Sequence, residues 1–123
     1  MSSTAITLPA PSAPSAVWER GCPVDELEPG WGEALLVRMK QIAVFLLGTG
    51  EVYAVAHRDP ATGSNVMARG IVGSKGDRPT IASPLHKQVY DLGTGECFTD
   101  PRLMLGTYRT RVVGGFLEVE LQP

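Results

Sequence analysis

The sequence predicts an all-β protein. Four short runs, at residues 16–22, 33–39, 41–47 and 51–56, are rich in strand-forming side chains and are separated by turn residues. A Gly-Gly turn joins two further runs near the C-terminal end. Strands this short and this closely spaced are typical of a β-sandwich or barrel.

Ordered structure is expected to begin at residue 16. Residues 1–15 are mostly Ser, Thr, Ala and Pro, and their prolines deny a helix its hydrogen bonds. We therefore predict a disordered tail at residues 1–15, followed by one domain at residues 16–123. Apolar and polar residues roughly alternate from Ala16 to Cys22, as on a half-buried strand. Residues 23–30 are predicted to form a connecting turn.

The next three runs are predicted to form the centre of the fold. Residues 33–39 and 41–47 are separated by Lys40, and the second run is apolar on both faces. Gly48-Thr49-Gly50 is a hairpin turn that leads to the strand at residues 51–56. Residues 41–47 are therefore expected to be a central strand.

A long loop follows. Glycine and proline interrupt residues 57–80 throughout, and a loop of this length is unusual unless it has a function. Short strands are predicted at residues 80–82 and 87–92, on either side of a second loop. A glycine turn at residues 93–95 and a further loop at residues 97–106 lead to the last strands.

A hairpin is predicted to close the domain. It pairs residues 108–113 with residues 116–121 through Gly114-Gly115, which can adopt the positive φ of a type I′ turn. Strand alternation predicts which side chains face the core and which face water. The core set is Leu117, Val119 and Leu121, and the water-facing set is Glu118 and Glu120.

The segment Leu-Gly-Thr-Gly-Glu occurs twice, at residues 47–51 and 92–96. Nothing that flanks the two copies matches, whereas a true structural repeat extends over about 20 residues or more. Neither copy precedes a predicted helix, so neither is a credible phosphate-binding loop. We interpret the repetition as the same turn chemistry used twice.

Composition describes an ordinary soluble globular protein. Hydrophobic residues make up 43% of the 123 residues, charged residues make up 20%, and the net charge is -2. The longest apolar run, residues 42–47, is far shorter than the roughly 20 residues that cross a bilayer. The first fifteen residues lack the Lys or Arg of a secretory signal, so a cytoplasmic location is expected. Cys22 and Cys97 form neither a disulfide framework nor a CxxC motif.

One segment resembles a metal-binding loop. In Rieske iron–sulfur domains the second cluster loop reads Cys-Pro-x-His-Gly and runs into a strand, and here Ser83-Pro84-Leu85-His86 precedes the strand of Tyr90 and Leu92. A longer set resembles the small subunit of assimilatory NAD(P)H-dependent nitrite reductase, and the resemblance spans about residues 16 to 121. That set is Val52-Tyr53-Ala54-Val55, Asp59-Pro60, residues 64–73, residues 82–88, and Cys97 with Asp100-Pro101.

The resemblance implies a Rieske-like fold whose long loops form the former cluster tip. It also implies that the iron–sulfur ligands are absent, and that the chain accompanies a large subunit carrying FAD, an iron–sulfur cluster and siroheme. A Rieske centre needs Cys-x-His in its first loop and Cys-x-x-His in its second. When the flanking residues are matched, the four ligand positions become Asp59, Ala61, Ser83 and His86. Because three of the four ligands are missing, we expect no cluster in this chain.

Two other sites can be considered. His57, Asp59 and His86 match the composition of a 2-His-1-carboxylate iron site. The simpler interpretation is that Asp59 starts a turn, His57 ends a strand and His86 hydrogen-bonds within its loop. Ser83 with His86 could suggest a nucleophile and a base, but no third orienting group or oxyanion arrangement is visible. We therefore predict no catalytic residue and no metal in this chain.

Charge distinguishes the two loops from the rest of the chain. Residues 58–87 carry a net charge of +3, so the remainder carries -5. Because both loops belong to one tip in a Rieske-like fold, positive charge would lie there beside apolar side chains, which suits docking on an acidic partner surface. The predicted partner-binding residues are Arg58, Met67, Arg69, Ile71, Lys75, Arg78, Leu85 and Lys87.

These observations predict a cluster-free, Rieske-like small subunit of nitrite reductase that binds and stabilises its large subunit. The reaction that the resemblance implies is the reduction of nitrite to ammonium by NADH or NADPH. This chain offers no flavin-binding or haem-binding residues, so catalysis is expected to belong to the large subunit. The alternatives are a Rieske-type ferredoxin that carries electrons and an independent mononuclear non-heme iron protein.

Overall fold

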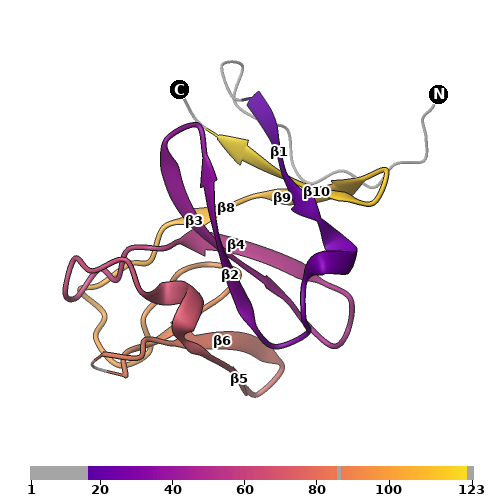
Figure 1. Cartoon of the computed structure of the whole chain (residues 1–123). Helices are drawn as coiled ribbons and strands as arrows, with labels where there is room; N and C mark the ends of the chain where they lie inside the picture. Colours follow the sequence, from indigo (N-terminus) through magenta and orange to yellow (C-terminus); the bar gives the residue numbers. More distant parts are fainter. Residues whose placement is uncertain (1–16, 86, 122–123) are drawn as a thin grey trace.

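The computed structural model describes residues 17–85 and 87–121 (Figure 1). Within them the chain forms ten strands and two 3-10 helices, which confirms the predicted all-β class. The predicted tail at residues 1–15 lies outside the described residues. The strands are β1 (Val17–Pro23), β2 (Gly32–Val37), β3 (Lys40–Leu46), β4 (Val52–Ala56), β5 (Ile71–Lys75), β6 (Arg78–Ala82), β7 (Val89–Asp91), β8 (Thr107–Tyr108), β9 (Thr110–Val113) and β10 (Phe116–Leu121). The helices are η1 (Val24–Glu26) and η2 (Met67–Arg69).

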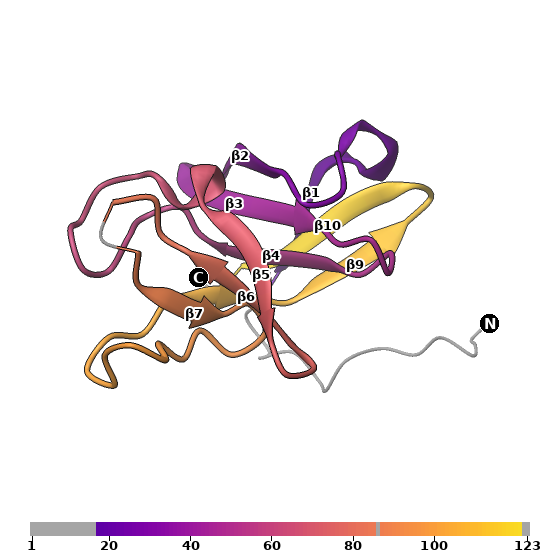
Figure 2. The same ribbon diagram turned by 90° about the horizontal axis from the view of Figure 1, so that it is seen from below.

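The strands form three antiparallel sheets. Their orders are β1-β10-β9, β2-β3-β4-β8 and β5-β6-β7. Figure 2 shows the small β5-β6-β7 sheet lying across the larger β2-β3-β4-β8 sheet, with the long loops gathered at one end. None of the helices in the described part of the chain is long and apolar enough to span a membrane.

β3 is buried on both faces, as the sequence predicts. Because successive side chains of a strand point to opposite faces, Ile42 and Val44 enter one core cluster while Ala43 and Phe45 enter the other. The first cluster also contains Leu27, Val37, Ala54, Leu117, Val119 and Leu121. The second also contains Val55, Met67, Ile81, Tyr90, Leu92, Cys97 and Leu105. β3 therefore joins the two halves of the core.

The hairpin between β2 and β3 is tighter than the sequence predicts. β2 ends at Val37, which pairs with Lys40 across a two-residue turn made by Arg38 and Met39. Both turn residues have left-handed backbone angles, with φ of 48° and 67°. This geometry normally favours Asn or Gly, so the prediction extended the strand too far and treated Lys40 as a break.

The predicted loop at residues 57–80 contains a helix and a hairpin. η2 occupies its middle, and a turn at Gly76 (φ 64°) and Asp77 joins β5 to β6. β6 consequently begins at Arg78, two residues before the predicted strand. Glycine and proline in this region therefore mark tight turns within ordered structure.

The C-terminal hairpin confirms the predicted core set and corrects one surface residue. Leu117, Val119 and Leu121 are buried, but Glu120 is only 5% exposed. The Glu120 carboxylate lies 3.7 Å from the Arg109 guanidinium, which provides an opposite charge where the prediction expected water. Pairing of β10 with β1 on one side and β9 on the other covers this strand at both edges.

Candidate functional site

The two loops that correspond to cluster loops meet at one tip. Residues 57–66 follow β4 and residues 83–85 follow β6, and Figure 2 shows the two loops at the same end of the molecule. Asp59 is 0% exposed and Ser83 is 1% exposed. The Ser83 hydroxyl donates a hydrogen bond to Asp59 Oδ2 at 2.5 Å. The two residues at the positions of the cysteine ligands are therefore in direct contact, 24 residues apart in sequence.

The first loop is folded around Asp59. Its Oδ1 accepts a hydrogen bond from the Ala61 amide at 2.8 Å, which fixes a local turn. The Asp59 carbonyl accepts from the Gly63 amide at 2.7 Å, and the Asp59 amide donates to the Ser64 carbonyl at 2.7 Å. Both carboxylate oxygens are consequently used inside the tip.

The second loop keeps a tight turn although its ligand residue has changed. Ser83 Oγ accepts a hydrogen bond from the Leu85 amide at 3.3 Å, and the Ser83 carbonyl accepts from the Lys87 amide at 3.1 Å. Lys87 has φ of 59°, at the position where the Rieske pattern has glycine. His86 lies outside the described residues, so its predicted ligand and loop roles are not described.

The donor set of the described tip does not fit a [2Fe–2S] centre. Two thiolates and two imidazoles hold that cluster, whereas Asp59 and Ser83 bond to each other and Ala61 offers only a methyl group. A hydroxyl and a carboxylate that satisfy each other in a buried position close the space between the loops. The geometry therefore favours a structural role for both residues.

His57 also has a structural role. The residue is 7% exposed, and its Nδ1 accepts a hydrogen bond from the Ala68 amide at 3.2 Å, within η2. The His57 carbonyl accepts hydrogen bonds from the Val66 and Met67 amides at 2.9 and 3.0 Å. Burial, and next the positive charge of Arg69, lower the pKa of His57, so the ring stays neutral and carries its proton on Nε2.

These contacts bear on the iron-site alternative. His57 Nδ1 and both oxygens of Asp59 are engaged within the chain, and the third residue of that set, His86, lies outside the described residues. Among the residues that the structure describes, no group of three or more His, Cys, Asp or Glu could hold a metal ion. The Ser83 hydroxyl, considered above as a nucleophile, donates its hydrogen bond to Asp59 and so has a structural role.

The predicted partner-binding residues do not form one continuous surface. Arg58, Leu85 and Lys87 are exposed at the tip itself. Arg69 is exposed at the end of η2, and Ile71, at the start of β5, is 73% exposed. Met67 does not belong to either surface, because its side chain is fully buried in the core. The expectation that Met67 forms part of an exposed patch is corrected by this burial.

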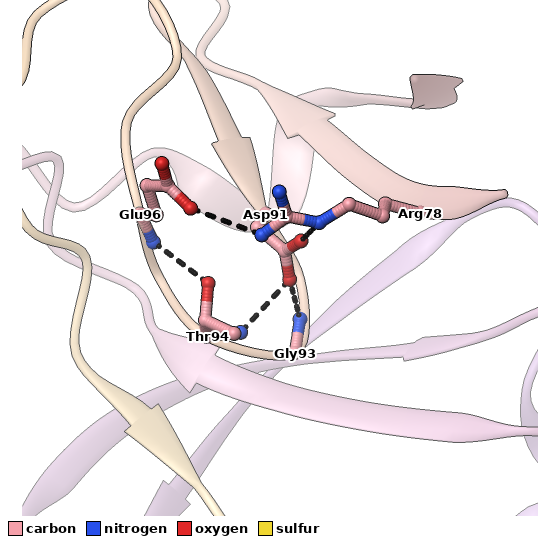
Figure 3. Close-up of polar contacts among 5 residues, drawn as sticks. All are labelled: Arg78, Asp91, Gly93, Thr94 and Glu96. Carbon is pink, nitrogen blue, oxygen red and sulfur yellow. Dashed lines mark hydrogen bonds and ion pairs between the residues drawn. The ribbon is translucent and has the colours of Figure 1, made fainter. Parts of the chain in front are cut away.

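Arg78 and Lys75 lie farther from the tip, on the hairpin of β5 and β6. Arg78 Nε contacts Asp91 Oδ2 at 2.6 Å and its Nη2 contacts Glu96 Oε1 at 3.0 Å (Figure 3). Both basic side chains also lie over the Phe98 ring, at 4.9 Å for Arg78 and 5.3 Å for Lys75. The guanidinium of Arg78 therefore stabilises the fold, whether or not it also contacts a partner.

Asp91 completes this polar cluster from the base of the next turn. Its Oδ1 accepts hydrogen bonds from the amides of Gly93 at 2.6 Å and Thr94 at 2.8 Å (Figure 3). Burial alone raises the pKa of Asp91, but the two amides and Arg78 outweigh it and leave the pKa below its usual value. The carboxylate is ionised and holds the turn closed.

Trp31 is a surface residue that the sequence analysis did not single out. Its side chain is 71% exposed, and it lines a groove of about 530 Å³ together with Ala68, Arg69 and Ile71. A tryptophan between two glycines, at the end of a predicted connector, was the available signal. An indole at such a position has little to pack against within its own segment, which is typical of a contact residue.

The chain is similar to known proteins over most of its length. A Rieske-like [2Fe-2S] domain family matches residues 17–120. The Salmonella typhimurium nitrite reductase (NADH) small subunit is 30% identical over 103 residues, which is 83% of this chain and 95% of that protein. A crystal structure of a Mycobacterium tuberculosis protein, described as a candidate NADH-dependent nitrite reductase small subunit, has a TM-score of 0.83 and 40% identity, covering 88% of this chain and 97% of that one.

One similar protein is much larger. The nitrite reductase [NAD(P)H] large subunit of Klebsiella oxytoca is 35% identical over 85 residues, which is 69% of this chain but only 9% of that protein. A segment similar to this chain is therefore part of a polypeptide named as a large subunit.

Proposed function

Because the chain belongs to the Rieske-like domain family and, within it, to the nitrite reductase small subunits, we propose that it binds and stabilises a nitrite reductase large subunit. The observation that carries this proposal is the extent of the match, which includes 95% of a curated small subunit. The segment found within the Klebsiella large subunit supports a physical association, since covalent fusion keeps two domains together.

The proposed role is accessory. Hydride uptake from NADH and six-electron reduction of nitrite to ammonium require flavin and siroheme chemistry, and FAD, an iron–sulfur cluster and siroheme are assigned in this proposal to the large subunit. The tip of this chain supports the assignment, because Asp59 and Ser83 satisfy each other's hydrogen bonds. The proposed location is the cytoplasm, where reduced nicotinamide cofactors are available.

The docking surface proposed for the tip is made by Arg58, Leu85 and Lys87. Leu85 is 47% exposed and belongs to the same meeting loops as the two exposed cations, so apolar contact and positive charge occur at one tip. The backbone of Lys87 strengthens this choice. A left-handed φ is strained for lysine, and strained residues of this kind concentrate at functional sites.

Reconstitution tests the proposed function. Large subunit is produced alone and together with this chain, and NADH-dependent ammonium formation and thermal stability are measured for both preparations. We expect the two chains to co-purify, and the complex to be more stable than the isolated large subunit by several degrees, because a ligand that binds only the folded state stabilises it. If this chain changes neither the ammonium formation nor the thermal stability of the large subunit, the proposal is wrong.

Lys87→Gly separates folding from docking at the tip. Glycine adopts a left-handed φ without strain, so the isolated chain should gain about 1 kcal/mol of unfolding free energy. The same change removes a positive charge, so association with the large subunit should slow, and added salt should reduce the difference from wild type. A variant that is more stable but associates at the wild-type rate would remove Lys87 from the docking surface.

The electron-carrier alternative is tested by colour and metal content. A Rieske ferredoxin is brown and carries stoichiometric iron and sulfide, whereas the donor set described at this tip predicts a colourless preparation without either. The mononuclear-iron alternative predicts one bound Fe(II) that is lost on His86→Ala. Anaerobic purification followed by metal analysis distinguishes all three expectations.

A further inference from the structure

The groove beside Trp31 continues along one strand. The hollow lined by Trp31, Arg69 and Ile71 adjoins a second hollow of about 290 Å³, and both are lined by Gly30 and Val72. The second hollow follows β5 toward Asp77, and the turn after β3 forms its opposite wall. Together the two hollows border β5 from end to end.

β5 has a free backbone edge. In the sheet order β5-β6-β7 it is an outer strand, paired only with β6 among the described residues. Ser74 faces Pro79 across that pair, and the Pro79 carbonyl accepts a hydrogen bond from the Leu92 amide, beside β7, at 3.0 Å. Because both backbone groups of a strand residue point to the same side, Ser74 and Pro79 exchange no hydrogen bond. The amide and carbonyl of Ser74, and those of Val72 two residues earlier, therefore point outward.

The ends of the groove differ in charge. Arg69 is the charged residue of the first hollow, and it makes no ion pair with any residue that the structure describes. Glu51 and Asp77 line the second hollow. Trp31 and Ile71, both more than two-thirds exposed, provide apolar walls at the Arg69 end. The groove thus offers backbone hydrogen-bonding groups along its length and an apolar site at one end. The opposite charges of its two ends would orient a bound segment.

We propose that an extended segment of the large subunit lies in this groove and pairs with β5 as a fourth strand. Strand addition at a free edge uses backbone hydrogen bonds for affinity and side-chain sites for specificity. The segment would carry a carboxylate and an apolar side chain for the Arg69 end, and a basic residue about four positions away for the end at Glu51 and Asp77. This inference rests on the proposed function, since it names the partner of that assembly.

The experiment measures binding of the intact large subunit to variants of the whole chain. Ser74→Pro removes the outward amide proton while leaving the bonds of β5 to β6, and Ser74→Ala is its control because it keeps that proton. Trp31→Ala removes the apolar wall, and Arg69→Glu reverses the free charge. Leu36→Ala is a further control, since Leu36 is 67% exposed but does not line the groove.

The expected result is a loss of affinity of about tenfold or more for Ser74→Pro, Trp31→Ala and Arg69→Glu, with both controls within about twofold of wild type. Circular dichroism checks that each variant is folded. If Ser74→Pro does not fold, the affinities of Trp31→Ala and Arg69→Glu decide the outcome. Wild-type binding that none of these variants weakens would overturn the groove while leaving the proposed function intact. Absence of wild-type binding overturns both.

Discussion

The same five residues, Leu-Gly-Thr-Gly-Glu, form a turn in two different surroundings. The copy at residues 47–51 joins β3 to β4 at the surface, and a Cβ added to Gly50 would meet no atom within 4 Å. The copy at residues 92–96 follows β7, and a Cβ added to Gly95 would lie 2.0 Å from the Leu105 carbonyl oxygen. Both glycines have positive φ, at 94° and 83°. The positive φ of this glycine is shared, and the packing around it is not.

The residue before each copy explains much of the difference. The Asp91 side chain precedes the second copy and accepts hydrogen bonds from its Gly93 and Thr94 amides, while Leu46 precedes the first and has no side-chain acceptor. Asp91 also contacts Arg78 across the sheet, which ties the second turn to β6. The first turn is held by its own backbone, through hydrogen bonds such as that from the Gly50 amide to the Leu47 carbonyl at 2.9 Å. The turn sequence therefore specifies a left-handed glycine, and the neighbouring residues determine which hydrogen bonds close the turn and how much stability depends on it.

The largest expected effect comes from matched glycine substitutions. Gly95→Ala should destabilise the protein by about 3 kcal/mol or more, because the new methyl group meets a backbone carbonyl as well as an unfavourable φ. Gly50→Ala should cost only about 1 kcal/mol, since φ is its sole penalty. Urea unfolding of both variants measures the difference. Equal losses would mean that the second copy does not depend on its packing.

The next effect concerns the carboxylate. Asp91→Ala should cost about 2 kcal/mol, because it leaves two amides and the Arg78 guanidinium without their acceptor. The cost is lower than for a fully buried ion pair because the Arg78 side chain is 42% exposed and water screens its charge. Arg78→Ala should cost less than Asp91→Ala for the same reason. The reverse order in thermal unfolding would place the stabilising centre at the guanidinium.

Acid should weaken the second turn selectively. The pKa of Asp91 is lower in the folded state than in the unfolded chain, so its contribution is complete above the unfolded value of about 4. That contribution is lost as pH falls through the folded pKa. The stability difference between wild type and Asp91→Asn should therefore shrink in this acid range and stay constant above about pH 5. A difference that does not change with pH would mean that the carboxylate titrates normally.

The smallest expected effect is the same in both copies. Thr94 Oγ1 accepts a hydrogen bond from the Glu96 amide at 3.2 Å, and Thr49 Oγ1 accepts one from the Glu51 amide at 3.5 Å. Both bonds are exposed, so Thr94→Ala and Thr49→Ala should each cost about 0.5 kcal/mol. Calorimetric melting of the pair tests this equality. A clear excess at either site would show that the two turns differ in local chemistry as well as in packing.

Local patterns predicted much of the fold. The apolar run on both faces of β3, the Gly-Gly hairpin and the two Leu-Gly-Thr-Gly-Glu turns depend on neighbouring residues, and all were predicted from the sequence. The turn at Arg38 and Met39 escaped prediction because neither residue favours a left-handed backbone. Glu120 was predicted to face water, because strand alternation does not indicate that the Arg109 guanidinium lies beside it.

The candidate site was less accessible to sequence analysis. The four ligand positions could be identified from flanking residues, but the contact between Ser83 and Asp59 depends on how two distant loops meet. Met67 was expected at the surface because its loop was assigned to the exposed tip, yet η2 carries it into the core. Trp31 and Arg69 come together only through the approach of η2 to the start of β2. Tertiary packing of this kind leaves no local pattern.

The hydrogen bond between Ser83 and Asp59 has a consequence for how the protein is made. In a Rieske domain the thiolate and imidazole ligands of two loops are joined through the cluster that they bind. In this chain the polypeptide itself provides both halves of the closure. The proposed cluster-free role therefore predicts that this domain folds without iron, and that a cell short of iron still accumulates it in finished form.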